Sequence, residues 1–215
     1  MGHKNICFQH HQLLLFLRKQ FIICIVQITL FNIQIITKLF IHFKSSHKGF
    51  YCNRAALVVN EKWCHINELG KQVYSNSFSW SGNYQENLCT VRDKNNQYFH
   101  IDLNGQKVYS EKYIYAGDFK DGFACVKNAD GFYKHIDTRG NFINEVNFLD
   151  LGIFHKNYAT AKDEGGWHHI DKQGRELYSQ RYLAIEPLYN GFALVTQFNM
   201  DKVIINEKGN KIITI

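Results

Sequence analysis

Apolar and polar positions alternate along residues 55–215 in short runs that Gly and Asn separate. Runs of four to seven β-branched and aromatic residues with a period near two are typical of short β-strands. No helical apolar period of useful length appears after residue 55. The pattern predicts an all-β domain built of β-meanders, and the strands of one unit are represented by the runs 98–102, 106–110, 113–119 and 122–127.

The same pattern recurs about every 35 residues, as the phrases "YFHIDLNG", "YKHIDTRG" and "WHHIDKQG" show. Units of this size bury their apolar faces only by stacking on neighbours. We expect four antiparallel units and a partial fifth over residues 55–215. They would form a propeller-like ring, in which a strand from around residues 49–59 completes the last unit, or alternatively an open β-solenoid. Glycine closes the phrase in every unit, at Gly70, Gly105, Gly140, Gly174 and Gly209.

A histidine and an Asp or Asn stand two residues apart in four of the five phrases, which raises the question of a catalytic or metal site. The Asp or Asn lies three residues before the glycine, where its side chain caps a type I turn and the glycine supplies a positive φ. No nucleophile accompanies the histidines, and they could converge on one metal only in a narrow ring. We expect packing or hydrogen bonds between neighbouring units, and no catalytic, cofactor-binding or metal-binding residue, for the column His65, His100, His135 and His169.

Residues 1–50 form a different segment, apolar and free of Asp and Glu. Its run "FIICIVQITLFNIQIIT" (21–37) has no charge, but it is short for a membrane span and contains three polar amides. The segment is either a membrane or signal anchor, a mistranslated start, or a buried or disordered arm.

Charge and cysteine content narrow the functional classes. The net charge of +6 comes from residues 1–60, which hold seven Lys and Arg and no acid, whereas residues 61–215 hold 18 Lys and Arg against 19 Asp and Glu. A near-neutral repeat domain argues against nucleic-acid binding. The six cysteines lack CxxC or paired spacing, which favours reduced thiols in a cytoplasmic protein. Membrane attachment would require residues 21–37 to be a genuine anchor.

The stretches "GDFKDGFACVKNADGFYKHIDTRG" (117–140) and "GGWHHIDKQGRELY" (165–178) resemble the bacterial WG (KWG) repeat family. The Trp of that family remains only at Trp63 and Trp167, and its following Gly is replaced by Cys64, Phe99, Lys134 and His168. The "HID" form looks like a subgroup in which the repeats can accompany a methyltransferase-like domain, but no GxGxG cofactor loop is present here.

The resemblance implies a scaffolding or recognition role. We therefore expect a non-enzymatic module that binds an unknown protein or peptide and needs no cofactor. The alternatives are a catalytically silent recognition fragment of a larger bacterial, methyltransferase-linked enzyme, and a glycan-binding, lectin-like module.

Overall fold

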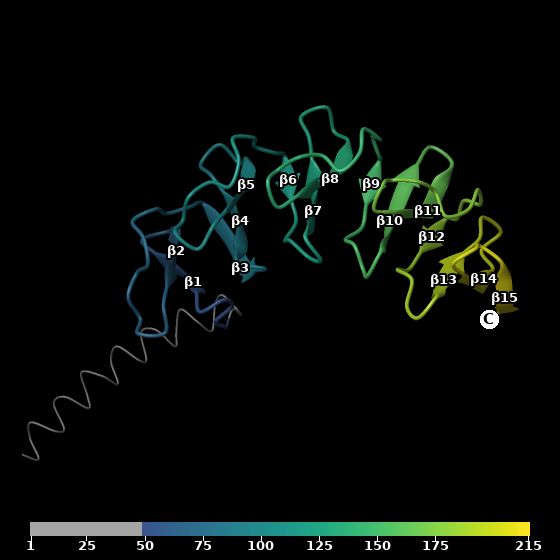
Figure 1. Ribbon diagram of the computed structural model, residues 1–215, viewed down its shortest axis with the longest axis horizontal. Coiled ribbons are helices and arrows are strands. Elements are labelled where there is room, and N and C mark those ends of the chain that lie inside the picture. The colour runs from purple at the N-terminus through teal and green to yellow at the C-terminus, as the bar shows by residue number, and fades with distance from the viewer. Residues whose placement is uncertain (1–48) are drawn as a thin grey trace, which may run out of the picture. The chain divides into compact units, whose positions relative to one another are not determined.

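The computed structural model describes residues 49–215, which fold into five small antiparallel sheets with no helix (Figure 1). The chain divides into two units, residues 1–47 and 48–215. The interpretations of residues 21–37 and of most of the leader therefore lie outside the described residues. Between residues 49 and 215 there is no helix long and apolar enough to cross a membrane.

Fifteen strands make up the five sheets. The first sheet pairs β1 (Ala55–Val59) with β2 (Lys62–Ile66). The second contains β3 (Trp80–Gln85), β4 (Leu88–Arg92) and β5 (Tyr98–Ile101), and the third contains β6 (Tyr115–Ala116), β7 (Phe123–Lys127) and β8 (Tyr133–Asp137). The fourth contains β9 (Asp150–Leu151), β10 (Tyr158–Asp163) and β11 (Gly166–Asp171). The fifth contains β12 (Ala184–Ile185), β13 (Phe192–Thr196), β14 (Lys202–Asn206) and β15 (Lys211–Thr214).

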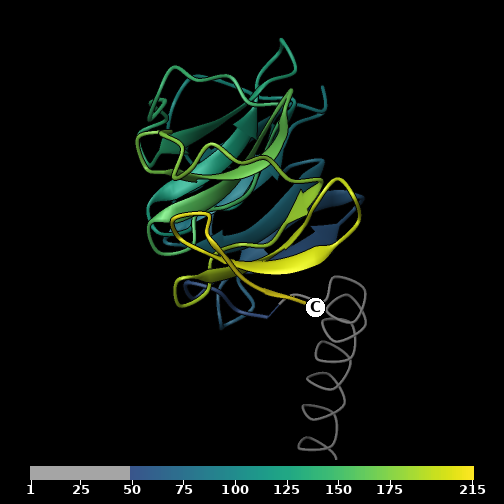
Figure 2. The same ribbon diagram turned by 90° about the vertical axis from the view of Figure 1, so that its right-hand side faces the viewer.

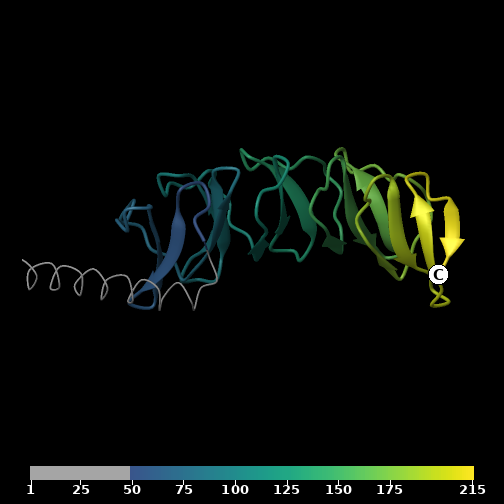
Figure 3. The same cartoon turned by 90° about the horizontal axis from the view of Figure 1, so that it is seen from below.

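Successive sheets lie beside one another in chain order, with their strands crossing the direction of the row (Figures 1 and 3). Figure 2 views this row from the side of the fifth sheet. Each of the last four sheets carries its own buried apolar cluster. The expected columns of the repeat supply these clusters, so the all-β, tandem-meander prediction is confirmed and the arrangement is propeller-like. One such column is almost completely buried: Ile101, Ile136, Ile170 and Ile205.

The strand boundaries within one unit differ from the prediction. Residues 106–110 form only an isolated bridge, between Lys107 and Ile101, and the run 113–119 contributes the two-residue strand β6. Strand β6 is moreover the first strand of the next sheet, where it pairs with β7. The reason is that this segment crosses from one sheet to the next, and its Gly117 carbonyl accepts side-chain hydrogen bonds in place of extending the ladder.

The expected completion of the last unit by residues 49–59 is wrong. Strand β1 instead pairs with β2, through a two-residue turn in which Asn60 and Glu61 both have positive φ, 49° and 63°. This turn geometry matches the twist of a tight hairpin and keeps β1 beside β2. The fifth sheet takes its fourth strand, β15, from residues 211–214.

The turn prediction is confirmed in every repeat. Asp137 Oδ1, for example, accepts hydrogen bonds from the backbone N–H groups of Arg139 and Asn141, at 2.8 and 2.9 Å. Gly140 follows with φ +86°. It has a second role that the turn alone does not require: a Cβ at this position would lie 2.5 Å from the ring of Tyr109, which comes from the preceding repeat. A tyrosine ring approaches Gly105 and Gly209 in the same way, whereas the side chain of Asn144 takes that place at Gly174.

Substitution can separate the two roles of Gly140, which are its positive φ and its close contact with the Tyr109 ring. Gly131 has nearly the same φ as Gly140, +88°, but nothing lies within 4 Å of its hypothetical Cβ. Gly131→Ala should therefore cost only the backbone strain, about 1 kcal/mol. Gly140→Ala should destabilise by about 1–3 kcal/mol more, because the methyl group overlaps the Tyr109 ring. Urea unfolding of both variants measures the difference, and equal losses would show that the ring does not constrain the turn.

Candidate functional site

The buried histidine of each of the first four repeats connects two neighbouring sheets. In the second sheet, His100 Nε2 lies 2.8 Å from the carbonyl oxygen of Gly117, which belongs to the third repeat. Its Nδ1 contacts the hydroxyl of Tyr109, and Phe119 packs on the ring with centroids 4.5 Å apart. A carbonyl can only accept, so Nε2 carries the proton and Nδ1 accepts from the tyrosine.

The other histidines repeat this arrangement with small changes. His135 donates to the Gly152 carbonyl at 2.8 Å, and His169 donates to the Glu186 carbonyl at 2.9 Å. His65 contacts the Tyr74 hydroxyl and lies 3.0 Å from Ser81 Oγ. The prediction of hydrogen bonding between neighbouring units is thus confirmed, and the four histidines bind their own neighbours and do not converge.

Burial keeps these imidazoles neutral. It lowers the pKa of His100, His135 and His169 to about 4 in each case, and the carbonyl that each ring donates to opposes the shift only in part. A buried imidazole whose Nε2–H is donated to a backbone carbonyl is poorly suited to accept a proton from a substrate. The column is a structural element of the interfaces.

One repeat lacks the tyrosine. Asn144 stands nine residues after His135, where the other repeats have Tyr74, Tyr109 and Tyr178. Both His135 Nδ1 and Asn144 Nδ2 are buried without a hydrogen-bond partner. Two unsatisfied polar atoms mark this as the weakest of the four histidine contacts.

A second polar cluster, in the fourth repeat, has the composition of a metal site. Ligand atoms of Asp163, His168 and Glu176 lie within 4.8 Å of one another. However, Arg181 Nη2 lies 2.6 Å from a carboxylate oxygen of both Asp163 and Glu176, so a guanidinium already supplies the positive charge. Burial, and then Arg181, lower the pKa of His168. The cluster is accordingly an ion-pair network that links the hairpin of β10 and β11 to the segment that follows it.

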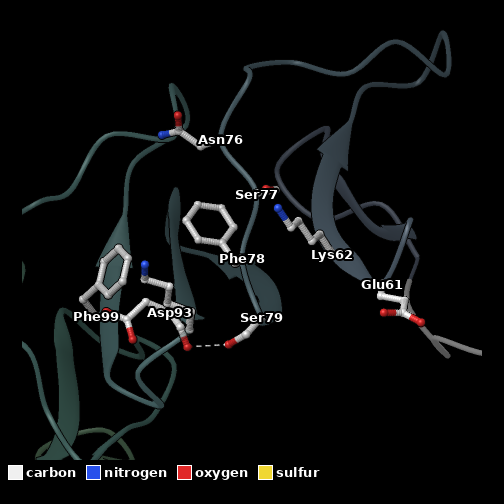
Figure 4. Close-up of a pocket in the computed structure, with 9 residues that line it drawn as sticks. Glu61, Lys62, Asn76, Ser77, Phe78, Ser79, Asp93 and Phe99 are labelled. Atoms are coloured by element: carbon white, nitrogen blue, oxygen red, sulfur yellow. Dashed lines mark hydrogen bonds between the residues drawn. The ribbon is translucent and has the colours of Figure 1, made fainter.

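The candidate binding site is a pocket between the first and second sheets, with a cavity volume of about 570 Å³. Its floor consists of Phe78 and Phe99, whose ring centroids are 6.2 Å apart (Figure 4). The hairpin turn of the first sheet and the segment that connects the two sheets form its rim. The other lining residues are Glu61, Lys62, Asn76, Ser77, Ser79, Asp93 and Lys94.

Two lysines lie over one ring of the aromatic floor. Lys107 Nζ and Lys112 Nζ lie 5.0 and 5.6 Å from the centroid of the Phe99 ring. Lys112 also pairs with Asp93 Oδ2 at 2.5 Å, so it neutralises one of the two acids at the pocket. Exposed Lys62 and Lys94 then outnumber the single remaining acid of the lining, Glu61, so the pocket has an excess of positive charge. The pocket therefore favours a ligand that combines an apolar group with negative charge.

Two of the polar residues that line the pocket, Ser79 and Asp93, already make contacts within the protein. Ser79 Oγ lies within hydrogen-bond distance of the backbone carbonyls of Arg92 and Asp93, at 2.9 and 2.5 Å, and Figure 4 shows the contact with Asp93. Partial burial acts to raise the pKa of Asp93, but hydrogen bonds from Lys112 and from backbone N–H groups outweigh it and leave the pKa below its usual value. A weakly basic carboxylate and a donating hydroxyl suit binding better than proton transfer.

One position of the repeat that lines the pocket varies between repeats. Phe99 is equivalent to Lys134 and His168, and these fill the corresponding positions differently. Lys134 is 7% exposed, with Nζ 4.7 Å from the Phe142 ring centroid and 3.7 Å from Glu145. His168 faces the Arg181 network. Sequence reasoning noted this variable column as a departure from the WG pattern but did not identify it as a site. The signal in the sequence was that the residue type at this position differs between repeats, whereas the neighbouring positions keep the same residue type.

The comparisons with known proteins agree with the fold. No protein-family model matches the chain, and no curated protein matches it. The computationally designed protein Ika8 is similar in structure, with a TM-score of 0.51 and 14% identity over 78% of this chain and 60% of that one. BamB from Moraxella catarrhalis (TM-score 0.48, 16% identity) covers the same shares. The WD40 β-propeller domain of Doa1 (TM-score 0.40, 11% identity) covers 76% and 64%.

These likenesses concern the fold, and the chain spans about 60% of the length of the structures it matches. The class defined by the sheets and their contacts is an all-β, β-propeller-like repeat protein.

The neutral buried histidines predict a specific acid sensitivity. Because the pKa of His100, His135 and His169 falls from about 6.5 to about 4 on folding, the unfolded chain binds more protons than the folded chain between these values. Stability should be fully present above pH 6.5 and decrease toward pH 4, by at most about 1.4 kcal/mol per pH unit for each histidine.

Urea unfolding from pH 7 to pH 4.5 measures this slope. His100→Gln should reduce the slope by about one histidine's share. A slope that does not respond to His100→Gln would contradict the assignment.

The missing tyrosine predicts a stabilising substitution. Asn144→Tyr should place a hydroxyl beside His135 Nδ1, as Tyr109 does for His100, and raise the free energy of unfolding by about 1 kcal/mol. Asn144→Phe supplies the ring without the hydroxyl and should gain less. Denaturant midpoints compare the three proteins, and a loss of stability in Asn144→Tyr would mean that the interface between the third and fourth sheets cannot accept the ring.

Proposed function

We propose that residues 49–215 form a non-enzymatic binding module for a protein or peptide partner. The observation that carries this proposal is the pocket between the first two sheets. It combines an aromatic floor with exposed Lys62 and Lys94 at its edge, while Ser79 and Asp93 are already engaged in hydrogen bonds and an ion pair. Pockets of this kind anchor one side chain of a partner and recognise a charge next to it.

The fold supports the same reading. Propeller-like repeats provide a rigid frame whose connecting segments and hairpin turns are free to vary, and binding residues commonly lie on such segments. The pocket follows this rule, since its rim comes from a hairpin turn and from the segment between two sheets. The match of the repeat phrases to the WG pattern supports membership of the WG family, as a further part of the proposal.

A peptide selection with the full chain tests the function. Peptides enriched from a random displayed library should carry an aromatic or large apolar residue next to Asp or Glu. Their affinity should fall at least about tenfold in Lys94→Glu, because the substitution reverses the charge at the rim. Lys208→Glu, in the turn of the last hairpin, is the matched control and should bind like the original chain. If no peptide is enriched, or if Lys94→Glu binds as well as the control, the pocket is not the binding site.

A further inference from the structure

A second surface, distinct from the pocket, follows from the register of the sheets. In the second sheet Trp80 lies opposite Arg92, and Arg92 opposite Tyr98. Side chains at directly opposed positions share one face of a sheet. The third sheet has the same sequence of residue types, because Tyr115 lies opposite Lys127 and Lys127 opposite Tyr133. We call these six residues the aromatic–cation row: Trp80, Arg92, Tyr98, Tyr115, Lys127 and Tyr133.

The two halves of the row are joined through their rings. Tyr98 and Tyr115, from neighbouring sheets, have centroids 6.0 Å apart. The distances between ring centroids within each sheet are similar, 5.9 Å from Trp80 to Tyr98 and 6.5 Å from Tyr115 to Tyr133. Neighbouring rings of the row meet at tilted or edge-to-face angles. Tyr115 is 45% exposed and the other members are half-buried.

Each sheet adds one cation to the row. The Arg92 guanidinium lies 5.7 Å from the centroid of Tyr98, and Lys127 Nζ lies 4.9 Å from that of Tyr133. The fourth sheet continues the pattern with Lys162 beside Trp167, 5.9 Å from its ring, but has Asp150 in place of the first aromatic residue. The surface therefore combines regularly spaced rings with regularly spaced positive charge.

We propose that the aromatic–cation row binds a proline-rich peptide in the polyproline II conformation that carries acidic residues at every third position. Polyproline II segments dock between aromatic side chains, and they bind at low entropic cost because they are already extended. Tyr and Trp also supply hydrogen-bond donors for the peptide carbonyls, which have no internal partners. Charge complementarity with Arg92 and Lys127 requires the acidic residues.

The spacing of the row fits this ligand. Two ring steps, 6.0 and 6.5 Å, separate Tyr98 from Tyr133, so the rings beside the two cations are at most about 12.5 Å apart. Residues at i and i+3 of a polyproline II helix lie on one face, about 9.3 Å apart at 3.1 Å per residue. Flexible Arg and Lys side chains can bridge the remainder. An acidic residue at every third position thus places one carboxylate near each cation and leaves prolines for the rings.

Single-stranded nucleic acid is the competing ligand, because stacking rings and cations also describe its binding sites. The repeat region argues against it, since residues 61–215 carry 18 Lys and Arg against 19 Asp and Glu. A strand of phosphates would meet that near-neutral surface, including Asp150 at the end of the row. The inference shares with the proposed function only the idea of a peptide ligand, and it rests on other residues.

The test uses synthetic peptides and the full chain, with tryptophan fluorescence and calorimetry as readouts. The peptide EPPEPPEPP should bind. The peptide EEEPPPPPP has the same composition but the wrong spacing, and EGGEGGEGG has the right spacing but no stiffness. Each should bind at least about fivefold more weakly. Preference for EEEPPPPPP, or equal binding of all three, would overturn the assigned ligand.

Two variants locate the site. Tyr115→Ser and Lys127→Glu should each weaken EPPEPPEPP binding at least about tenfold, whereas Tyr189→Ser, an exposed tyrosine outside the row, should not. Lys94→Glu in the pocket should also leave this binding unchanged, so failure of the row and failure of the pocket are distinguishable. Circular dichroism verifies that each variant is folded. Tighter binding of a thymidine nonanucleotide than of the peptide, lost in Lys127→Glu, would assign the row to nucleic acid and overturn the proposal.

Discussion

The hydrogen bond from a buried, neutral histidine to a backbone carbonyl of the next repeat is the contact on which the assembly of sheets depends. A strand no longer than two residues, such as β6, offers few ladder hydrogen bonds of its own. His100 holds it in place by accepting from Tyr109 on one nitrogen and donating to Gly117 with the other. Because the imidazole is desolvated, losing either partner would leave a buried polar atom unpaired, and the contact therefore specifies one arrangement of neighbouring sheets.

The same contact explains why glycine closes each phrase. The tyrosine that reaches the histidine lies against the glycine of the following repeat, so one side chain touches two repeats at once. A typical repeat thus contributes a histidine and a tyrosine, and the tyrosine ring of the preceding repeat packs on its turn glycine. Stability in such an assembly is shared between intrinsic folding of a unit and nearest-neighbour contacts. The third repeat, with Asn144 in place of tyrosine, keeps only half of the contact and shows how the interfaces can differ in strength.

Local chemistry was predictable from the sequence, whereas chemistry across sheets was not. The cap by Asp137 and the positive φ of Gly140 follow from residue types within four positions, so the turns were predicted correctly. The pairing of His100 with Tyr109 depends on how residues 106–113 cross to the next sheet, and that path was mistaken for a regular strand. For the same reason the second role of Gly140, as the surface on which a ring rests, left no signal in a single phrase.

The positions of the two proposed binding surfaces follow from this difference between the interior of the sheet interfaces and their edges. The histidine, the tyrosine and the small buried residues determine the packing inside each interface between sheets. The residue types that differ between repeats therefore lie mainly at the edges of these interfaces. At one margin, Phe99, Lys134 and His168 occupy equivalent positions with three different chemistries, and Phe99 lines the pocket between the first two sheets. At the other, ring and cation positions persist through the second and third sheets and change at Asp150 in the fourth. Identical frames with different margins leave room for the two recognition surfaces that we propose, without altering the contacts that hold the sheets together.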